Sequence, residues 1–117
     1  ALLFILSTDL KKAGFDIHTV NRGGTEATDA CKRVRPDLII MDAMMPGTDG
    51  FETCSMLKAD VETRIVPVIM ISAITERSYK EKALKAGALH YYHKPFKFDS
   101  LLQLIKETLG MVPSEAN

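Results

Sequence analysis

Two runs of consecutive apolar residues constrain the fold of this chain more than any other feature. One is "LIIM", residues 38–41, and the other is "VPVIMIS", residues 66–72. Strands of a parallel sheet have this pattern because both of their faces are buried. Segments with helical spacing lie between and after these runs, so the pattern predicts an α/β chain with helices on both faces of a parallel sheet.

The helical segments have apolar residues at the i, i+3, i+4 and i+7 spacing of a one-sided helix. The last of them is expected to begin with a capping box formed by Ser100 and Gln103. Shorter alternating segments predict further strands at 15–20 and 88–93, and residues 111–117 are expected to be a tail or the start of a linker. This gives one domain over 1–110. Helices are predicted over residues 25–35, 50–60, 76–87 and 100–110.

Length and composition narrow the class of protein. With 117 residues, 46% of them hydrophobic, the chain suits a single domain with its own core. Lys and Arg number 15 and so do Asp and Glu, which gives no electrostatic case for direct contact with nucleic acid or an acidic membrane. No apolar run approaches the roughly 20 residues of a membrane span. Cys31 and Cys54 form no CxxC pair, so buried thiols in a reducing cytoplasm are expected.

Polar residues follow three of the expected strands. Asp42 ends the first apolar run, Ser72 ends the second, and Lys94 follows the strand at 88–93. The carboxyl ends of parallel strands meet at one edge of the sheet, where such folds bind their ligands. A carboxylate nucleophile beside an ammonium and a hydroxyl suits the formation of an acyl phosphate. A buried Asp–Lys ion pair without chemistry is the alternative reading of the same residues.

The stretches "PDLIIMDAMMPGTDGFE", "VPVIMISA" and "KAGALHYYHKPF" resemble the response-regulator receiver domain of two-component signalling. The resemblance runs from about Leu3 to Leu109 and implies a flavodoxin-like doubly wound parallel sheet. By position, Asp42 resembles the phosphoacceptor, Ser72 the switch hydroxyl and Lys94 the lysine that contacts the phosphoryl group. Tyr91 resembles the aromatic residue whose rotamer reports activation, and Met44 would offer its backbone carbonyl to Mg²⁺.

The resemblance also implies partners and a mode of action. A histidine kinase or phosphotransfer protein would supply the phosphoryl group, and an output domain or partner protein would respond, with homodimerisation possible. We expect a cytoplasmic protein without direct contacts to nucleic acid or membrane, and no enzymatic activity beyond autocatalytic transfer to its own Asp42. The alternative is a degenerate or truncated pseudo-receiver that binds proteins independently of phosphorylation. The signal, the kinase and the output are not specified by the sequence.

The chain departs from the family near its first residues, where the family has a strand ending in an acidic pair that holds Mg²⁺. That pair is not found here. Leu3, Leu6, Leu10 and Ala13 have helical spacing, so residues 1–13 are expected to form the first helix, with the first strand absent. The other reading makes "ALLFIL" that strand and Asp9 a remnant of the pair. It leaves too short a connection to the next strand for a parallel crossover.

Loss of a central strand would leave the backbone groups of its neighbours unpaired. We therefore expect one of three outcomes: a fragment of a longer chain, a strand supplied by another chain, or a rearrangement of the expected helix to fill the gap. With Asp42 as the only side-chain ligand, Mg²⁺ binding would be weak or absent, and the chain would be phosphorylated slowly or not at all. A haloacid-dehalogenase-type hydrolase is disfavoured because Met44 stands where it needs a second aspartate, and the phosphate loop of a flavodoxin is absent.

Overall fold

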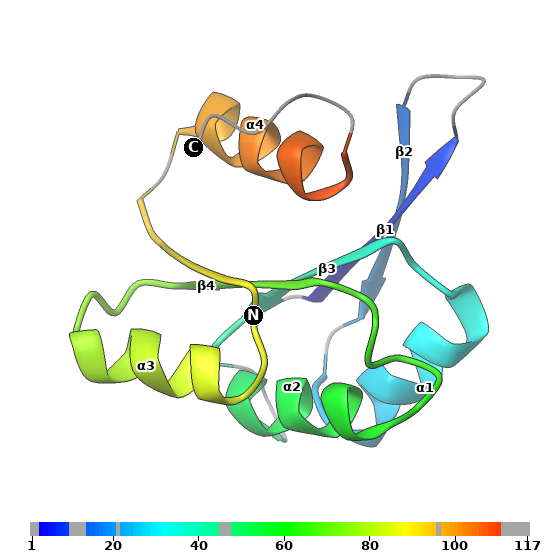
Figure 1. Cartoon of the computed structure of the whole chain (residues 1–117), viewed down its shortest axis with the longest axis horizontal. Coiled ribbons are helices and arrows are strands. Elements are labelled where there is room, and N and C mark those ends of the chain that lie inside the picture. Colours follow the sequence, from blue (N-terminus) through cyan, green and yellow to red (C-terminus); the bar gives the residue numbers. More distant parts are fainter. Residues whose placement is uncertain (1–2, 10–13, 21, 45–47, 96, 111–117) are drawn as a thin grey trace.

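A computed structural model describes residues 3–9, 14–20, 22–44, 48–95 and 97–110, with the backbone alone for 3–9, 14–19 and 98. Its strands and helices alternate after an N-terminal pair of strands (Figure 1). The strands are β1 (Leu3–Asp9), β2 (Gly14–Val20), β3 (Leu38–Asp42), β4 (Val68–Ser72) and β5 (His90–His93). The helices are α1 (Thr25–Val34), α2 (Gly50–Ala59), α3 (Arg77–Lys85) and α4 (Phe98–Thr108).

The strands form one sheet in the order β2-β1-β3-β4-β5. β3, β4 and β5 are parallel, with Met41 beside Met70 and Met70 beside Tyr91. β1 is antiparallel to both of its neighbours, β2 and β3. The predicted α/β class is confirmed, and the sheet is parallel apart from β1.

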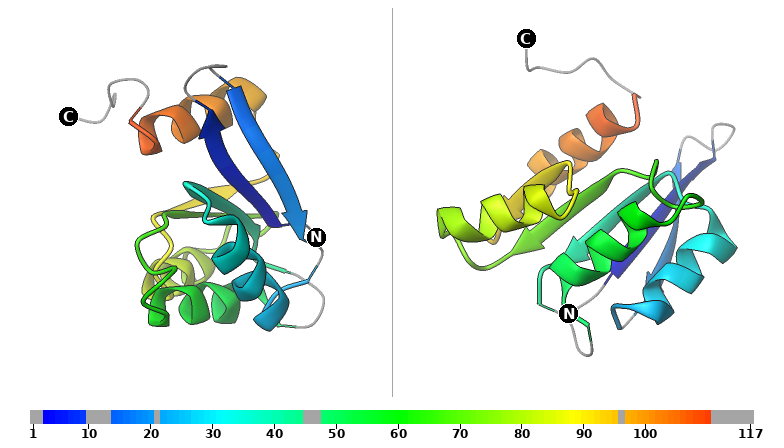
Figure 2. Two further views of the ribbon diagram at one scale, coloured as in Figure 1. Left: turned by 90° about the vertical axis from the view of Figure 1, so that its right-hand side faces the viewer. Right: turned by 60° about the horizontal axis from the view of Figure 1, so that its bottom comes forward.

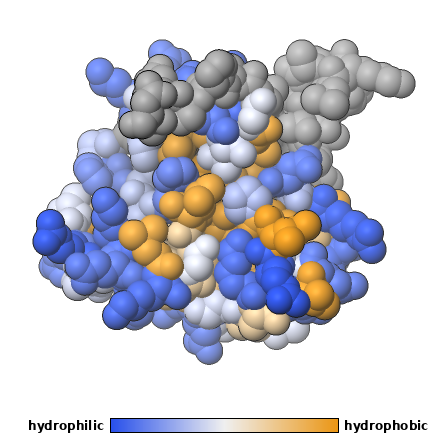
Figure 3. Space-filling model, viewed as in Figure 1, coloured by the Kyte–Doolittle hydropathy of each residue, from blue (hydrophilic) through white to orange (hydrophobic). Residues whose placement is uncertain are grey.

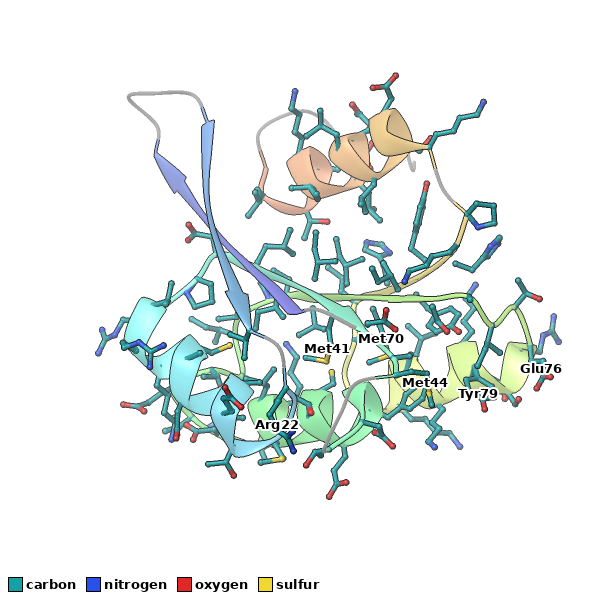
Figure 4. All side chains as sticks on the ribbon, turned by 180° about the vertical axis from the view of Figure 1, so that it is seen from behind. Arg22, Met41, Met44, Met70, Glu76 and Tyr79 are labelled. Atoms are coloured by element: carbon teal, nitrogen blue, oxygen red, sulfur yellow. The ribbon has the colours of Figure 1, made fainter. Side chains whose placement is uncertain are left out.

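Helices cover both faces of the sheet (Figures 1 and 2). Helices α1, α2 and α3 lie on one face and α4 lies on the other. Met41 and Met70 point to the face of α1–α3, where Figure 4 shows them side by side, whereas Ile40 and Ile69 join the cluster under α4. This alternation explains why β3 and β4 are apolar throughout. The helical residues buried in the first cluster include Ala27, Ala30, Cys31, Phe51, Cys54, Leu57 and Ala83.

The helix expected over residues 1–13 is wrong for the described part of that range. Leu3–Asp9 forms β1, whereas residues 1–2 and 10–13 lie outside the described residues. The expectation failed because it considered only a parallel crossover to the strand at Phe15, whereas an antiparallel partner needs only a short connection. The segment occupies the gap between β2 and β3, as the expected rearrangement would require.

The direction of β1 also decides the position of Asp9. Leu3 pairs with Met41 and Leu6 with Leu38, so β1 runs away from the carboxyl end of β3. Asp9 pairs with Gly14, beyond the first residue of β3. It therefore lies at the edge of the sheet opposite Asp42, and the reading of Asp9 as a remnant of the acidic pair is wrong.

Two further expectations concern helices. α4 begins at Phe98, after Lys97, and no side chain caps its first turn, so the capping box expected at Ser100 is wrong. Gln103 instead donates to Glu107 Oε1 one turn further on. In the part of the chain that the structure describes, no helix has the length and apolarity to span a membrane.

Candidate functional site

Asp42 is the last residue of β3, and its side chain is 14% exposed at the edge of the sheet. The chain leaves the strand in a fixed direction because Ala43 N–H donates to Ile71 O at 2.9 Å. It returns at the start of α2, where Gly50 N–H donates to Ala43 O at 2.9 Å. A Cβ at Gly50 would lie 2.4 Å from Asp42 O, so this close return requires glycine.

Lys94 reaches Asp42 from the other side of β4. Its backbone N–H donates to Ser72 O at 2.7 Å, which extends the pairing of β5 with β4 by one residue. Its Nζ lies 2.9 Å from Asp42 Oδ2. The structure therefore brings together the carboxylate and the ammonium that the strand-end argument selected, on β3 and after β5.

Ser72 is buried at the end of β4, 1% exposed, and its hydroxyl oxygen accepts the N–H of Ile74 at 3.1 Å. Tyr91 OH donates to the carbonyl oxygen of Ile74 at 2.6 Å. The two predicted switch residues thus meet on the backbone of Ile74, in the segment that leads from β4 to α3. Sequence reasoning missed Ile74 because its role is carried by backbone atoms, which leave no side-chain signal.

Met44 contacts the carboxylate through its backbone. Its N–H donates to Asp42 Oδ1 at 3.1 Å, and its side chain is largely exposed. Figure 4 labels Met44 among the residues near the carboxyl end of β3. Both oxygens of Asp42 are therefore bound by donors, one by Lys94 and one by Met44. The role of the Met44 carbonyl as a metal ligand remains a prediction.

The described residues do not fit a magnesium site by themselves. Mg²⁺ requires near-octahedral oxygen coordination, which proteins supply with one or two carboxylates beside phosphate and water. Among the described residues, no group of three or more His, Cys, Asp or Glu side chains could hold a metal ion. Asp42 already contacts an ammonium, which opposes a second cation at the same oxygen.

Comparison with known proteins gives a consistent result. The response regulator receiver domain family matches residues 1–106. The chain is 38% identical over 115 residues to the phosphate regulon transcriptional regulatory protein PhoB of Rhizobium meliloti, covering 98% of this chain and 50% of that protein. It is 35% identical over 109 residues to the DNA-binding response regulator MtrA of Mycobacterium tuberculosis H37Rv, covering 93% and 46%. The chain thus spans about half the length of these relatives.

Solved structures agree with the sequence relatives. The receiver domain of the sensor histidine kinase PA1611 from Pseudomonas aeruginosa PAO1 matches with a TM-score of 0.70 and 32% identity, over 78% of this chain and 74% of that one. That structure has a magnesium ion coordinated in its active-site cleft. Sequence, fold and the strand-end residues therefore agree that the chain belongs to the response regulator receiver domain family of two-component signalling.

Proposed function

We propose that Asp42 accepts a phosphoryl group from a histidine kinase or phosphotransfer protein, and that this event alters a partner-binding surface on α3, β5 and α4. The observation that carries the proposal is the 2.9 Å contact between Asp42 and Lys94 at the edge where β3, β4 and β5 end. A carboxylate that is partly exposed can be reached by a donor, and an adjacent ammonium can stabilise the negative charge of the transferred group.

The chemistry requires little of the protein beyond positioning. An oxygen of Asp42 attacks the phosphorus of a phosphohistidine, the P–N bond breaks, and its electron pair remains on the imidazole nitrogen, which then takes up a proton. Lys94 moves from the carboxylate to the phosphoryl oxygens. The Ser72 hydroxyl, turned from Ile74 towards the new group, would donate a further hydrogen bond.

The response would pass through Ile74 to the surface. Ile74 is bonded to both Ser72 and Tyr91, so a movement of the Ser72 hydroxyl alters the support of the segment before α3. The surface of α3 and the following turn exposes the leucines Leu84 and Leu89. Figure 3 shows apolar side chains amid hydrophilic ones on the face turned towards the viewer in Figure 1. A partner protein, an output domain or a second copy of the chain would bind here.

The test is the intact mass of the protein after incubation with acetyl phosphate, with and without MgCl₂. We expect a gain of one phosphoryl group that Asp42→Asn abolishes. Asp49→Asn is the matched control, because Asp49 lies in the same loop and its Oδ1 only caps Glu52 N–H, which asparagine also does. No gain in the unmodified chain would contradict the proposal.

The second candidate function is a binding module that operates without phosphate. The observation in its favour is that the described residues form no group of three or more metal ligands, and that Asp42 is paired with Lys94. In that case the α3–β5–α4 surface would bind its partner equally well before and after acetyl phosphate treatment. The mass measurement, combined with partner binding before and after treatment, separates the two candidates.

A further inference from the structure

Helix α3 is attached to the rest of the domain by few side chains. Ala83 is its buried residue and Tyr79 is partly buried. The other side chains of α3 are exposed (Figure 4 shows the helix with Tyr79 labelled). Because so little apolar surface of α3 is covered, the contacts that do hold the helix have a large share in fixing its position.

Two side chains of α3 contact one aromatic ring of α2. The ring centroids of Phe51 and Tyr79 are 5.9 Å apart, with the planes at 64°, an edge-to-face arrangement. Lys82 Nζ lies 4.6 Å from the centroid of the Phe51 ring, at cation–π distance. Tyr79 and Lys82 are three residues apart and so share one face of α3. We call these three residues the Phe51 clamp.

The position of Phe51 depends on how the chain returns from β3 to α2. Phe51 follows Gly50, whose N–H is bonded to Ala43 O and where an added Cβ would lie 2.4 Å from Asp42 O. The ring itself is 5% exposed and belongs to the buried cluster beneath β3 and β4. The clamp therefore connects α3 to the start of α2, which packs closely against the end of β3, where Asp42 lies.

A separate attachment holds the segment before α3. There, Ile74 is bonded to Ser72 Oγ through its N–H and to Tyr91 OH through its carbonyl oxygen. Besides the buried Ala83, two attachments therefore position α3: Ile74 connects the segment before it to the ends of β4 and β5, and the Phe51 clamp connects it to α2. The two attachments share no residue, so one can be released while the other persists.

We propose that the Phe51 clamp keeps α3 in its resting position and sets how far α3 moves when Asp42 is phosphorylated. This rests on the proposed function, because the release is the turning of the Ser72 hydroxyl from Ile74 to a phosphoryl oxygen. After that release, the clamp and Ala83 are the side-chain attachments described for α3. Tyr79 and Lys82 act as positioning residues, since they lie outside the phosphoacceptor site.

The first arm of the test measures hydrogen exchange of the α3 amides in the resting chain by mass spectrometry. We expect Tyr79→Leu to raise exchange over residues 79–87 roughly two- to tenfold, the factor that corresponds to one aromatic pair. Tyr79→Phe, which keeps the ring, and Lys80→Gln, which removes an exposed charge outside the clamp, should match the unmodified chain. Lys82→Gln should give a smaller rise. Exchange in Tyr79→Leu equal to that of the unmodified chain would overturn the proposal.

The second arm repeats the measurement after acetyl phosphate treatment. We expect the phosphorylation-dependent rise in α3 exchange to be smaller in Tyr79→Leu, because the helix is already loosened, while the mass gain at Asp42 is unchanged. An equal rise in both proteins would contradict the proposal that the clamp sets how far α3 moves on phosphorylation. If the unmodified chain gains no phosphoryl group, the proposed function fails, and with it the proposal that the clamp sets α3 movement on phosphorylation. The first arm still decides whether the clamp holds α3.

Discussion

Lys94 Nζ and Asp42 Oδ2 are 2.9 Å apart although the two residues are attached to strands that are not neighbours. The ion pair spans the end of β4, whose last residue, Ser72, is bonded to the backbone of Lys94. The pair thus joins the ends of β3 and β5, and its strength can be measured separately from any chemistry.

A double-mutant cycle with Asp42→Asn and Lys94→Met tests this pair. We expect a coupling free energy of about 0.5–1 kcal/mol, because Lys94 is 42% exposed and water screens the attraction. Urea unfolding of the four proteins supplies the value. A coupling of several kcal/mol would show that the pair is a structural element rather than a site that can open to a ligand.

Gly50→Ala should destabilise the protein by about 1–3 kcal/mol, the range for overpacking. An alanine in a helix usually stabilises relative to glycine, but here its Cβ would lie 2.4 Å from Asp42 O and 2.8 Å from Ala43 Cα. The free energy of unfolding in urea measures the effect. Ser55→Ala, on the exposed side of the same helix, is the control and should change stability by less than about 0.5 kcal/mol. A stabilising Gly50→Ala would contradict the described course of the loop.

The thiols of Cys31 and Cys54 should resist alkylation by iodoacetamide at pH 8 in the folded protein. Burial raises the pKa of each to about 11, so almost no thiolate is present, and both side chains are inaccessible. In urea both should be modified quickly, as intact mass would record. Because unfolded thiols ionise at lower pH than these, stability should also fall as pH rises from about 9 to about 11. Rapid modification without urea would refute the buried placement.

The Lys32–Asp60 ion pair, 2.7 Å between Nζ and Oδ2, should make stability depend on pH. The hydrogen bond between them lowers the pKa of Asp60 and raises the pKa of Lys32. Its contribution is therefore present at neutral pH, is lost as pH falls through the lowered pKa of Asp60, and is lost again as pH rises through the raised pKa of Lys32. Lys32→Met should flatten the acid side of the stability curve, measured as urea midpoints, whereas Lys80→Met should leave it unchanged. Parallel curves for Lys32→Met and the unmodified chain would contradict this.

Magnesium should bind the chain weakly and without a marked effect on its stability. Asp42 is already paired with Lys94, and the described residues form no group of three or more side chains that could hold the ion. Thermal unfolding in millimolar MgCl₂ should therefore give the same midpoint as in EDTA, with Asp42→Asn as the control. A rise in midpoint that Asp42→Asn abolishes would mean that residues outside those described complete a metal site.

The elements with strong local signals were predicted well. The apolar runs at 38–41 and 66–72 are β3 and β4, and the helices begin and end within a few residues of the expected bounds. The same patterns located Asp42, Ser72 and Lys94 at one edge, because parallel strands place their carboxyl ends together. Their roles in phosphorylation remain predictions.

The failures have a physical cause in tertiary structure. Leu3, Leu6, Leu10 and Ala13 have helical spacing. In residues 3–9, however, the position between two strands offers backbone hydrogen bonds that outweigh this local preference. Ile74, Tyr79 and Lys82 could not be identified as contacts from sequence, because their partners, Tyr91 and Phe51, are brought to them only by the sheet and by helix packing.

The reversed strand β1 has a consequence for the order of folding. Its pairing with β2 joins residues close in sequence, and such hairpins form on the order of microseconds. Its pairing with β3, over Leu3–Leu6 and Leu38–Met41, joins segments separated by all of α1 and must wait for a much larger loop to close. The β1–β3 pairing therefore separates two parts of the sheet. β1 and β2 pair locally, whereas β3, β4 and β5 pair through crossovers. We expect the β1–β3 pairing, which joins the two parts, to form last.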